Sequence, residues 1–195
     1  IQYRTSDESV FKKYLGGSGV AAKILMDEFD LGVDPLSPEN PLIFMNGLLT
    51  GLPVPTGAKS SFISKSPLTG IWNESTVGGH WGAQVKKCGL DGIILTGKSD
   101  TPVYIWINDE NVEIRDASEL MGLDVFETSD RIKSITDSKA VVACIGPAGE
   151  NQSKIAGIMI GGNETRAAGR GGLGAVMGSK NVKAMVAKGT KSANV

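Results

Sequence analysis

The residues with the clearest capacity for chemistry lie close together in residues 166–181 (RAAGRGGLGAVMGSKN). This stretch combines two arginines and a lysine with several glycines, and it contains no acidic residue. Guanidinium groups bind phosphate or carboxylate through paired hydrogen bonds. Backbone N–H groups in a glycine-rich turn that enters a helix form a concave anion site. The pattern therefore predicts an oxyanion site, for a phosphorylated or pterin-like ligand.

Two common phosphate-binding motifs do not describe this stretch. A P-loop needs Ser or Thr after its lysine, whereas Lys180 is followed by Asn181. Residues 169–174 contain a Gly-x-Gly, but they lie far from a first βα turn, where a dinucleotide fingerprint belongs. A flexible loop with solvated arginines remains the alternative, so spacing alone leaves the ligand open.

Histidine and cysteine are too scarce to build a metal site from side chains. His80 is the single histidine, and no cysteine or acid stands near it at metal-ligand spacing, which favours a packed or surface role. Cys88 and Cys144 form no CxxC motif, so this chain alone supplies neither a zinc ribbon nor the ligands of a cubane cluster. We expect both cysteines to be small buried apolar residues.

A second glycine-rich segment, residues 16–19 (GGSG), precedes a predicted helix. It has the composition of an anion-binding loop at a helix N-terminus. A plain turn between two helices fits the same residues, and the sequence leaves both interpretations open.

Length and composition indicate an ordinary globular protein. The 195 residues suffice for one large domain or two small ones, with 41% hydrophobic and 21% charged residues. A net charge of −1 excludes a strong field for nucleic acid or an anionic membrane. No apolar run approaches the roughly 20 residues of a membrane span, and we expect neither a membrane span nor a signal peptide. Because the sequence starts at Ile1, we expect a fragment of a longer protein.

Periodicity predicts a mixture of short strands and helices, with glycine loops converging on one surface. The clearest element is a hairpin over residues 103–114, with a turn of four polar residues. The other predicted strands cover residues 42–45, 62–66, 93–95, 140–145, 155–160 and 183–187, and the predicted helices lie within residues 6–30, 83–89 and 124–135. The fold class that follows is α+β.

Five segments in the same order resemble the N-terminal domain of the aldehyde:ferredoxin oxidoreductase family of tungstopterin enzymes. They are residues 37–44 (SPENPLIF), 55–70 (PTGAKSSFISKSPLTG), 97–107 (GKSDTPVYIWI), 144–151 (CIGPAGEN) and 166–181. The resemblance implies two similar mixed β-sheet halves with flanking helices that cradle a bis-pterin cofactor. It also implies that residues 1–195 form the N-terminal tungstopterin-binding domain of a larger oxidoreductase.

The resemblance implies cofactor contacts for eight residues. Arg166 and Arg170 would bind cofactor phosphate or pterin oxygens, and Lys59, where the family often has arginine, would bind a second phosphate. The main-chain carbonyls of Thr76, where the family commonly has asparagine, and Ala167 would face a magnesium ion that bridges the phosphates. The remaining contacts would come from backbone close to the pterin, at Val77, Gly78 and Gly169. No catalytic residue is expected in this chain.

The implied activity is oxidation of an aldehyde to a carboxylic acid by a cytoplasmic enzyme of an anaerobe. Tungsten or molybdenum would take two electrons from the aldehyde. A [4Fe-4S] cluster, whose ligands lie outside this chain, would then pass these electrons to ferredoxin. We expect the remaining domains as partners and a homo-oligomer at full length, but no nucleic acid or membrane. The alternatives are a non-catalytic phosphate-, pterin- or nucleotide-binding module and a related aromatic acyl-CoA reductase subunit.

Overall fold

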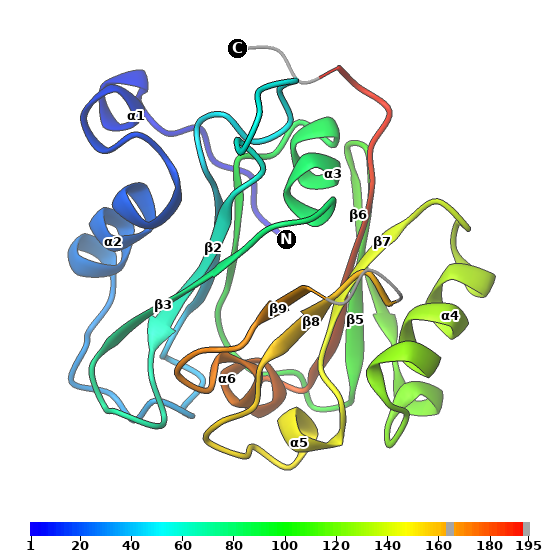
Figure 1. The fold of residues 1–195 in the computed structure, drawn as a ribbon. Coiled ribbons are helices and arrows are strands. Elements are labelled where there is room, and N and C mark those ends of the chain that lie inside the picture. The colour runs from blue at the N-terminus through cyan, green and yellow to red at the C-terminus, as the bar shows by residue number, and fades with distance from the viewer. Residues whose placement is uncertain (163–165, 193–195) are drawn as a thin grey trace.

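The structure is a computed structural model that describes residues 1–162 and 166–192. These residues form two β-sheets with helices on their outer faces (Figure 1). The first sheet has the order β3-β2-β1-β4, with β1 Leu42–Asn46, β2 Ser60–Lys65, β3 Trp72–Val77 and β4 Gly92–Leu95. The second has the order β6-β5-β10-β7-β8-β9, with β5 Val103–Asn108, β6 Asn111–Asp116, β7 Val141–Cys144, β8 Ile158–Ile160, β9 Arg166–Ala168 and β10 Val182–Lys188.

The predicted α+β class is confirmed, and the two sheets differ in their pairing. Every pair of neighbouring strands in the first sheet is antiparallel. The second sheet is mixed, because β10 runs parallel to β5 and antiparallel to β7. Each half therefore consists of a sheet with helices on its outer face. Only the six-stranded sheet contains both parallel and antiparallel strand pairs.

The main hydrophobic core lies between the two sheets. Leu42 and Phe44 of β1 point into it from one side, and Ile105 of β5 and Met185 of β10 point into it from the other. Helices α3 (Trp81–Lys87) and α6 (Leu173–Ser179) close its two ends (Figure 1). Because both sheets share this core, the described residues fold around one interior.

Helices cover the outward-facing residues of each sheet. Ile43 and Met45 alternate with the core residues of β1 and pack against α2 (Gly17–Glu28), beside α1 (Glu8–Tyr14). Tyr104 and Trp106 do the same on β5 and pack under α4 (Val125–Ile135). The period-two alternation of these strands thus places apolar residues on both faces of each sheet.

Local signals fix several of the predicted elements. Asp124 caps α4 by accepting hydrogen bonds from the N–H groups of Phe126 and Glu127, and Glu127 bonds back to the Asp124 N–H in a capping box. The hairpin is confirmed as β5–β6, but its turn is the pair Asp109-Glu110 rather than four residues. Asp109 allows this tight turn by adopting a φ of +50°.

Two edge strands, β3 and β9, are not among the strands predicted from the sequence. Trp72 and Thr76 are exposed on β3 while Ser75 and Val77 are buried, so polar and apolar residues do not separate cleanly between its faces. β9 has three residues, of which only Ala168 is buried. Neither strand therefore has the regular alternation of apolar and polar residues by which a strand is predicted from sequence.

Two lysines near the end of the chain belong to the fold rather than to a basic surface. Lys180 is 1% exposed, and its Nζ donates to the carbonyls of Pro38 at 3.0 Å and Gly97 at 3.3 Å. Lys183, in the strand predicted over residues 183–187, is buried, donates to Leu123 O at 2.8 Å and pairs with Glu150. Both lysines thus connect α6–β10 to loops far away in sequence.

No helix within residues 1–162 and 166–192 combines the length and the apolar character that crossing a membrane requires.

Burial of Lys180 predicts a pH-dependent stability. Desolvation lowers the pKa of Lys180 from 10.5 to about 8, with Glu39 opposing the shift. Between these values the unfolded chain keeps a proton that the folded protein has released, so the free energy of unfolding rises with pH. We expect this group to contribute a rise of up to about 3 kcal/mol from pH 8 to 10.5.

Urea denaturation across this pH range checks the assignment. Lys180→Met should remove the rise, whereas Lys98→Met, at an exposed position, should retain it. An equal rise in wild type and Lys180→Met would assign the pH dependence to a different group.

Candidate functional site

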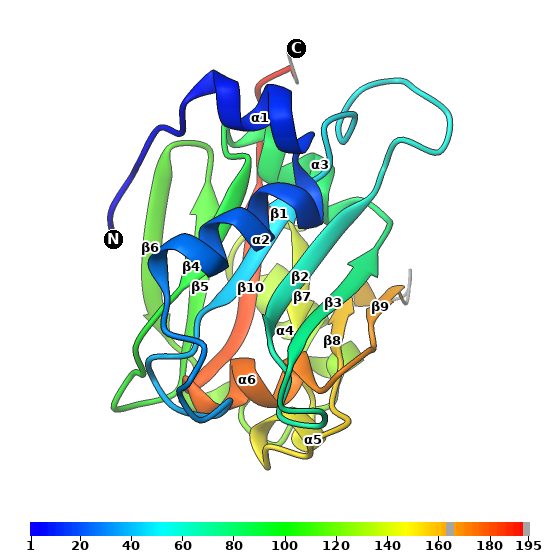
Figure 2. The same ribbon diagram turned by 90° about the vertical axis from the view of Figure 1, so that its left-hand side faces the viewer.

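The candidate site lies where the outer edges of the two sheets meet. β3 ends the first sheet and β9 ends the second, and the two strands lie side by side without forming a ladder (Figures 1 and 2). Backbone groups on the outer edge of such strands have no partner within their sheet. This β3–β9 edge, formed by residues 72–78 and 166–170, therefore offers main-chain donors and acceptors to a ligand.

Side chains of the β2–β3 hairpin fix the glycine-rich stretch against this edge. Ser75 Oγ accepts a hydrogen bond from the N–H of Arg170 at 3.0 Å, and Asn73 Nδ2 donates to the Arg170 carbonyl at 3.1 Å. Ser66 Oγ donates to the Gly171 carbonyl at 2.7 Å. The partners are 95 to 105 residues apart in sequence, so no local pattern could have predicted these contacts.

The structure brings the predicted residues of both sheets to this edge. Thr76 on β3 and Arg166 and Ala167 on β9 are all exposed, as are Gly169 and Arg170 in the loop after β9. The side chain of Val77 is only 4% exposed and belongs to the core between the sheets. Any ligand contact of Val77 would therefore come from its main chain.

Lys59 and Gly78 lie next to each other at the same end of the β2–β3 hairpin. A Cβ placed on Gly78 would lie 3.5 Å from the carbonyl oxygen of Ala58. The Lys59 carbonyl is held by Gly47 N–H at 3.0 Å and by Thr50 Oγ1 at 2.6 Å, and its side chain is exposed. This arrangement fixes the backbone of Lys59 and leaves its ammonium group available as a third cation.

The glycines of residues 166–181 divide into two groups. Four of the five are constrained by the protein itself. An added Cβ would lie 2.2 Å from the Asn73 side chain at Gly171, 2.1 Å from Lys154 O at Gly172, 2.4 Å from Gly157 O at Gly174 and 2.0 Å from Gly149 O at Gly178. Gly169 differs, because its φ is not positive and the nearest atom to an added Cβ is 3.8 Å away. Gly78 on the opposite strand is equally unconstrained.

This division supports a ligand at the β3–β9 edge. The fold explains why most of the glycines are there, but it does not explain Gly78 and Gly169. A group lying against the backbone would fill the space that a Cβ would occupy at these two positions. The residues present therefore fit an elongated anionic ligand.

The expected anion site at the start of α6 is wrong. All seven residues of α6 are buried, and the N–H of Gly174 donates to the carbonyl of Ala156 at 2.9 Å. Lys180 at the end of α6 is occupied by Pro38 and Gly97 rather than directed at a ligand. The cations that remain available in this region are Arg166 and Arg170.

The glycines of residues 16–19 also have packing reasons. An added Cβ would lie 2.9 Å from Asn46 O at Gly16 and 2.3 Å from Tyr14 O at Gly19. Gly16 forms an isolated bridge with Gly47. These contacts account for the segment as a turn between α1 and α2.

Asn46 is a polar residue near the site that the sequence did not single out. It is 2% exposed, and its Oδ1 accepts from Ser60 Oγ at 2.8 Å. Its Nδ2 is buried without a hydrogen-bond partner among the described residues. Asn46 bonds to Ser60, the residue that follows Lys59. Because an unsatisfied buried amide donor is unfavourable, a further polar group that accepts from Asn46 Nδ2 would be favourable here.

The remaining chemically capable residues do not form a second site. His80 is exposed at the N-cap of α3, and the described ranges hold no group of three or more His, Cys, Asp or Glu suited to a metal ion. Cys88 and Cys144 are free and buried, as predicted. Burial raises the pKa of the Cys144 thiol to about 12 and also raises that of Cys88, so both remain thiols at neutral pH.

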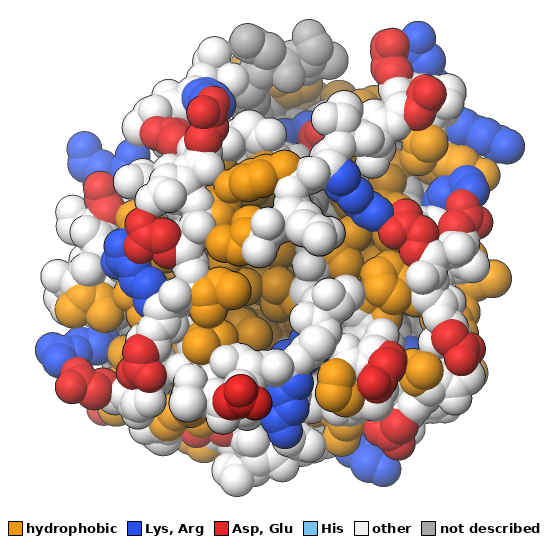
Figure 3. All heavy atoms as spheres, turned by 180° about the vertical axis from the view of Figure 1, so that it is seen from behind, with side chains coloured by type: hydrophobic (Ala, Val, Ile, Leu, Met, Phe, Trp, Pro, Cys, Tyr) orange, Lys and Arg blue, Asp and Glu red, His pale blue; other side chains and the backbone are white. Residues whose placement is uncertain are grey.

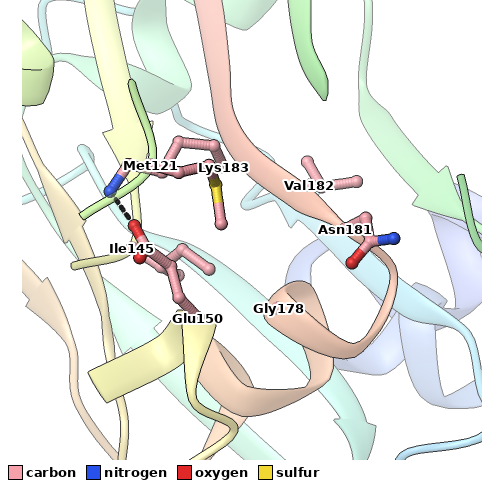
Figure 4. A pocket seen from close by; sticks show the side chains of 7 residues that line it. All are labelled: Met121, Ile145, Glu150, Gly178, Asn181, Val182 and Lys183. Carbon is pink, nitrogen blue, oxygen red and sulfur yellow. Dashed lines mark hydrogen bonds and ion pairs between the residues drawn. The ribbon is translucent and has the colours of Figure 1, made fainter. Parts of the chain in front are cut away.

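A small cavity lies apart from the β3–β9 edge, between α5 (Pro147–Glu150), α6 and β10 (Figure 4). It measures about 30 Å³, and the Lys183–Glu150 ion pair lies on its wall. This is the space of roughly one water molecule. The cavity is therefore too small for a cofactor.

Comparison with known proteins gives a consistent result. Residues 1–189 match the family described as "Aldehyde ferredoxin oxidoreductase, N-terminal domain". The chain is 50% identical over 193 residues to the tungsten-containing aldehyde ferredoxin oxidoreductase of Pyrococcus furiosus, covering 98% of this chain and 32% of that protein. It is 51% identical over 196 residues to the enzyme of the same name from Pyrococcus horikoshii, covering 100% and 32%.

A solved structure has the same fold. The active site complex BamBC of benzoyl coenzyme A reductase, in complex with 1,5-dienoyl-CoA, superposes with a TM-score of 0.93 at 45% identity. The match covers 97% of this chain and 29% of that chain. The chain thus spans about a third of the length of the curated relatives it matches.

The two groups of glycines predict opposite effects of the same substitution. Gly174→Ala forces a Cβ against a backbone carbonyl and should reduce the free energy of unfolding by about 2 kcal/mol or more. Gly169→Ala has room and should change it by less than about 1 kcal/mol, in the stabilising direction, because alanine restricts the unfolded chain. Urea denaturation monitored by tryptophan fluorescence measures both. A large destabilisation by Gly169→Ala would mean that the fold itself requires glycine there.

Proposed function

Because this chain belongs to the aldehyde ferredoxin oxidoreductase family, we propose that residues 1–195 are the N-terminal, cofactor-binding domain of a tungsten-dependent oxidoreductase. The observation that carries the proposal is the β3–β9 edge. It collects two arginines, two unconstrained glycines and the free edges of two strands from segments about 90 residues apart. A tungstopterin is an elongated, phosphorylated ligand of the kind this edge suits.

Each predicted residue has a role consistent with its position. The exposed guanidinium groups of Arg166 and Arg170 bind the phosphates or pterin oxygens through paired hydrogen bonds. Lys59 supplies a point charge to a second phosphate. Gly78 and Gly169 let the cofactor approach the backbone, and Val77 contributes main-chain groups only.

The proposed magnesium contacts are main-chain contacts. Thr76 and Ala167 lie on the two edge strands, so each offers a backbone carbonyl whose role does not depend on its side chain. The replacement of a family asparagine by Thr76 leaves such a carbonyl in place. Carbonyl and phosphate oxygens are the hard ligands that magnesium prefers.

The bound tungstopterin supplies the redox chemistry, two-electron oxidation of an aldehyde to a carboxylic acid. The residues of this chain hold and orient the cofactor and take no part in proton transfer. The ligands of a [4Fe-4S] cluster, the substrate channel and the ferredoxin contact belong to the rest of the polypeptide. We accordingly propose that the 195 residues alone are inactive, and that the full-length protein is a cytoplasmic homo-oligomer of an anaerobe.

A second candidate is a subunit of an aromatic acyl-CoA reductase on the same scaffold. It is favoured by the TM-score of 0.93 with a protein named for benzoyl coenzyme A reductase. The same cofactor base would serve this reaction, with tungsten or molybdenum as the metal. Assaying the full-length protein with aldehydes and with aromatic acyl-CoA thioesters distinguishes the two activities.

Removing an arginine from the edge should reduce the cofactor content of the full-length protein. Arg166→Ala or Arg170→Ala deletes a charge-assisted contact of about 1.5–3 kcal/mol, which corresponds to a roughly 10- to 100-fold loss of cofactor affinity. Both side chains are exposed, so the unfolding temperature of the cofactor-free protein should not change. Tungsten and pterin per chain are measured by elemental analysis and pterin fluorescence after purification without oxygen.

Arg131→Ala is the matched control, since Arg131 is an exposed arginine on α4, remote from the edge, paired with Glu119. It should keep wild-type tungsten and pterin content. Equal occupancy in Arg166→Ala, Arg170→Ala and Arg131→Ala would refute the site. Wild-type protein that folds but carries neither pterin nor metal would instead support a non-catalytic nucleotide- or phosphate-binding module.

A further inference from the structure

The edge of the molecule opposite the candidate site is open and apolar. β4 ends the first sheet there and β6 ends the second, as the side view shows (Figure 2). Seen from behind, apolar side chains gather in a recess in the middle of this side (Figure 3). The residues of this β4–β6 opening are Leu90, Ile93, Leu95, Val112 and Ile114.

The side chains of the opening point toward the core between the sheets. Ile105 pairs with Ile114 across β5 and β6, and Ile107 pairs with Val112, so all four residues share the face that the core occupies. Even so, Ile114 is 59% exposed. The main core is thus closed at the β3–β9 edge and uncovered at this one.

β4 is an edge strand without the usual protection. Its sequence, Gly92-Ile93-Ile94-Leu95, has no charged residue and no proline, and all four residues are only partly buried. The other outer strands each carry charge, with Glu74 on β3, Glu113 and Arg115 on β6 and Arg166 on β9. Natural sheets protect exposed edges with charges or proline, and β4 has neither.

We propose that in the full-length protein a β-strand from the polypeptide outside these 195 residues pairs with the free edge of β4, and that its apolar side chains cover the β4–β6 opening. The inference rests on the sheet edges and on the length of the relatives, and it does not depend on the cofactor site. It makes β4 an interior strand of a larger sheet.

The same polypeptide is a better source of this strand than a second copy. The matched relatives are about three times as long as this chain, so most of their length lies outside it. Segments near both ends of the described chain are tied to the β5–β6 turn: Tyr3 Oη donates to Glu110 O at 2.9 Å, and Thr190 N donates to Asp109 Oδ1 at 2.7 Å. Additional chain at either end would emerge near the opening, at a high effective concentration.

Hydrogen exchange with residue resolution on the full-length protein tests the pairing. In an edge strand every second N–H points away from the sheet and exchanges quickly. If β4 has a second partner, all four amides from Gly92 to Leu95 should exchange slowly. The amides that point away from β1 should exchange at least about 100-fold more slowly than amides on an unpaired strand edge. Fast exchange of alternate amides would overturn the proposal.

A substitution tests the covering of the opening independently. Ile114→Asp in the full-length protein should lower the unfolding temperature by about 5 °C or more, because it places a carboxylate in a covered apolar surface. Ile155→Asp is the control, since Ile155 is 72% exposed on a loop, and it should have little effect. Equal, small effects of the two variants would show that the opening faces solvent and would overturn the proposal.

Size-exclusion chromatography tests the alternative that a second copy of the protein covers the opening. If Ile114→Asp converted an oligomer into monomers while alternate β4 amides exchanged quickly, a second copy would cover the opening and the proposal would be wrong. An unchanged oligomeric state with a lowered unfolding temperature supports a strand from the same polypeptide.

Discussion

The arrangement of the site depends on how the Arg170 peptide is held. Its N–H donates to Ser75 Oγ and its carbonyl accepts from Asn73 Nδ2, so both sides of one residue are bonded to a single edge strand. This contact requires the segment after β9 to run against β3, and it joins the second sheet to the first. The exposed arginines, Thr76 and the two unconstrained glycines lie on or next to the segments that this contact joins.

Close backbone packing makes this contact possible. Gly171 has a φ of +68°, and an added Cβ would lie 2.2 Å from the Asn73 side chain, so a larger residue would be strained there and would displace the Asn73 amide that holds Arg170. Gly172, Gly174 and Gly178 bring the following helix against neighbouring carbonyls in the same way. Glycine therefore first builds the support of the site, and only Gly78 and Gly169 remain for the surface itself.

The two edges of the sheet pair have different chemistry. The β3–β9 edge presents cations and backbone groups, which suit an anionic cofactor. The β4–β6 opening presents isoleucine, leucine and valine, which suit packing against another segment of polypeptide. Between them, buried Lys180 and Lys183 bond to loop carbonyls and fix the ends of α6 and β10. The α6–β10 junction is thus fixed from inside the protein, while the two edges of the sheet pair stay available for different partners.

The sequence by itself determined the fold class, the hairpin, the helix over 125–135 and the buried strands, because their signals are local: strand alternation, helical periodicity and turn residues. It also identified the family, through segments distributed over nearly the whole chain. It did not predict β3 and β9, whose exposed and buried residues do not separate apolar from polar, and it placed Lys180 in the predicted anion-binding stretch although this lysine is buried in the fold. Which glycines support the fold, which remain free for a ligand, and which edge stays uncovered were decided only by the tertiary structure, since each answer depends on contacts between elements that are not adjacent in sequence.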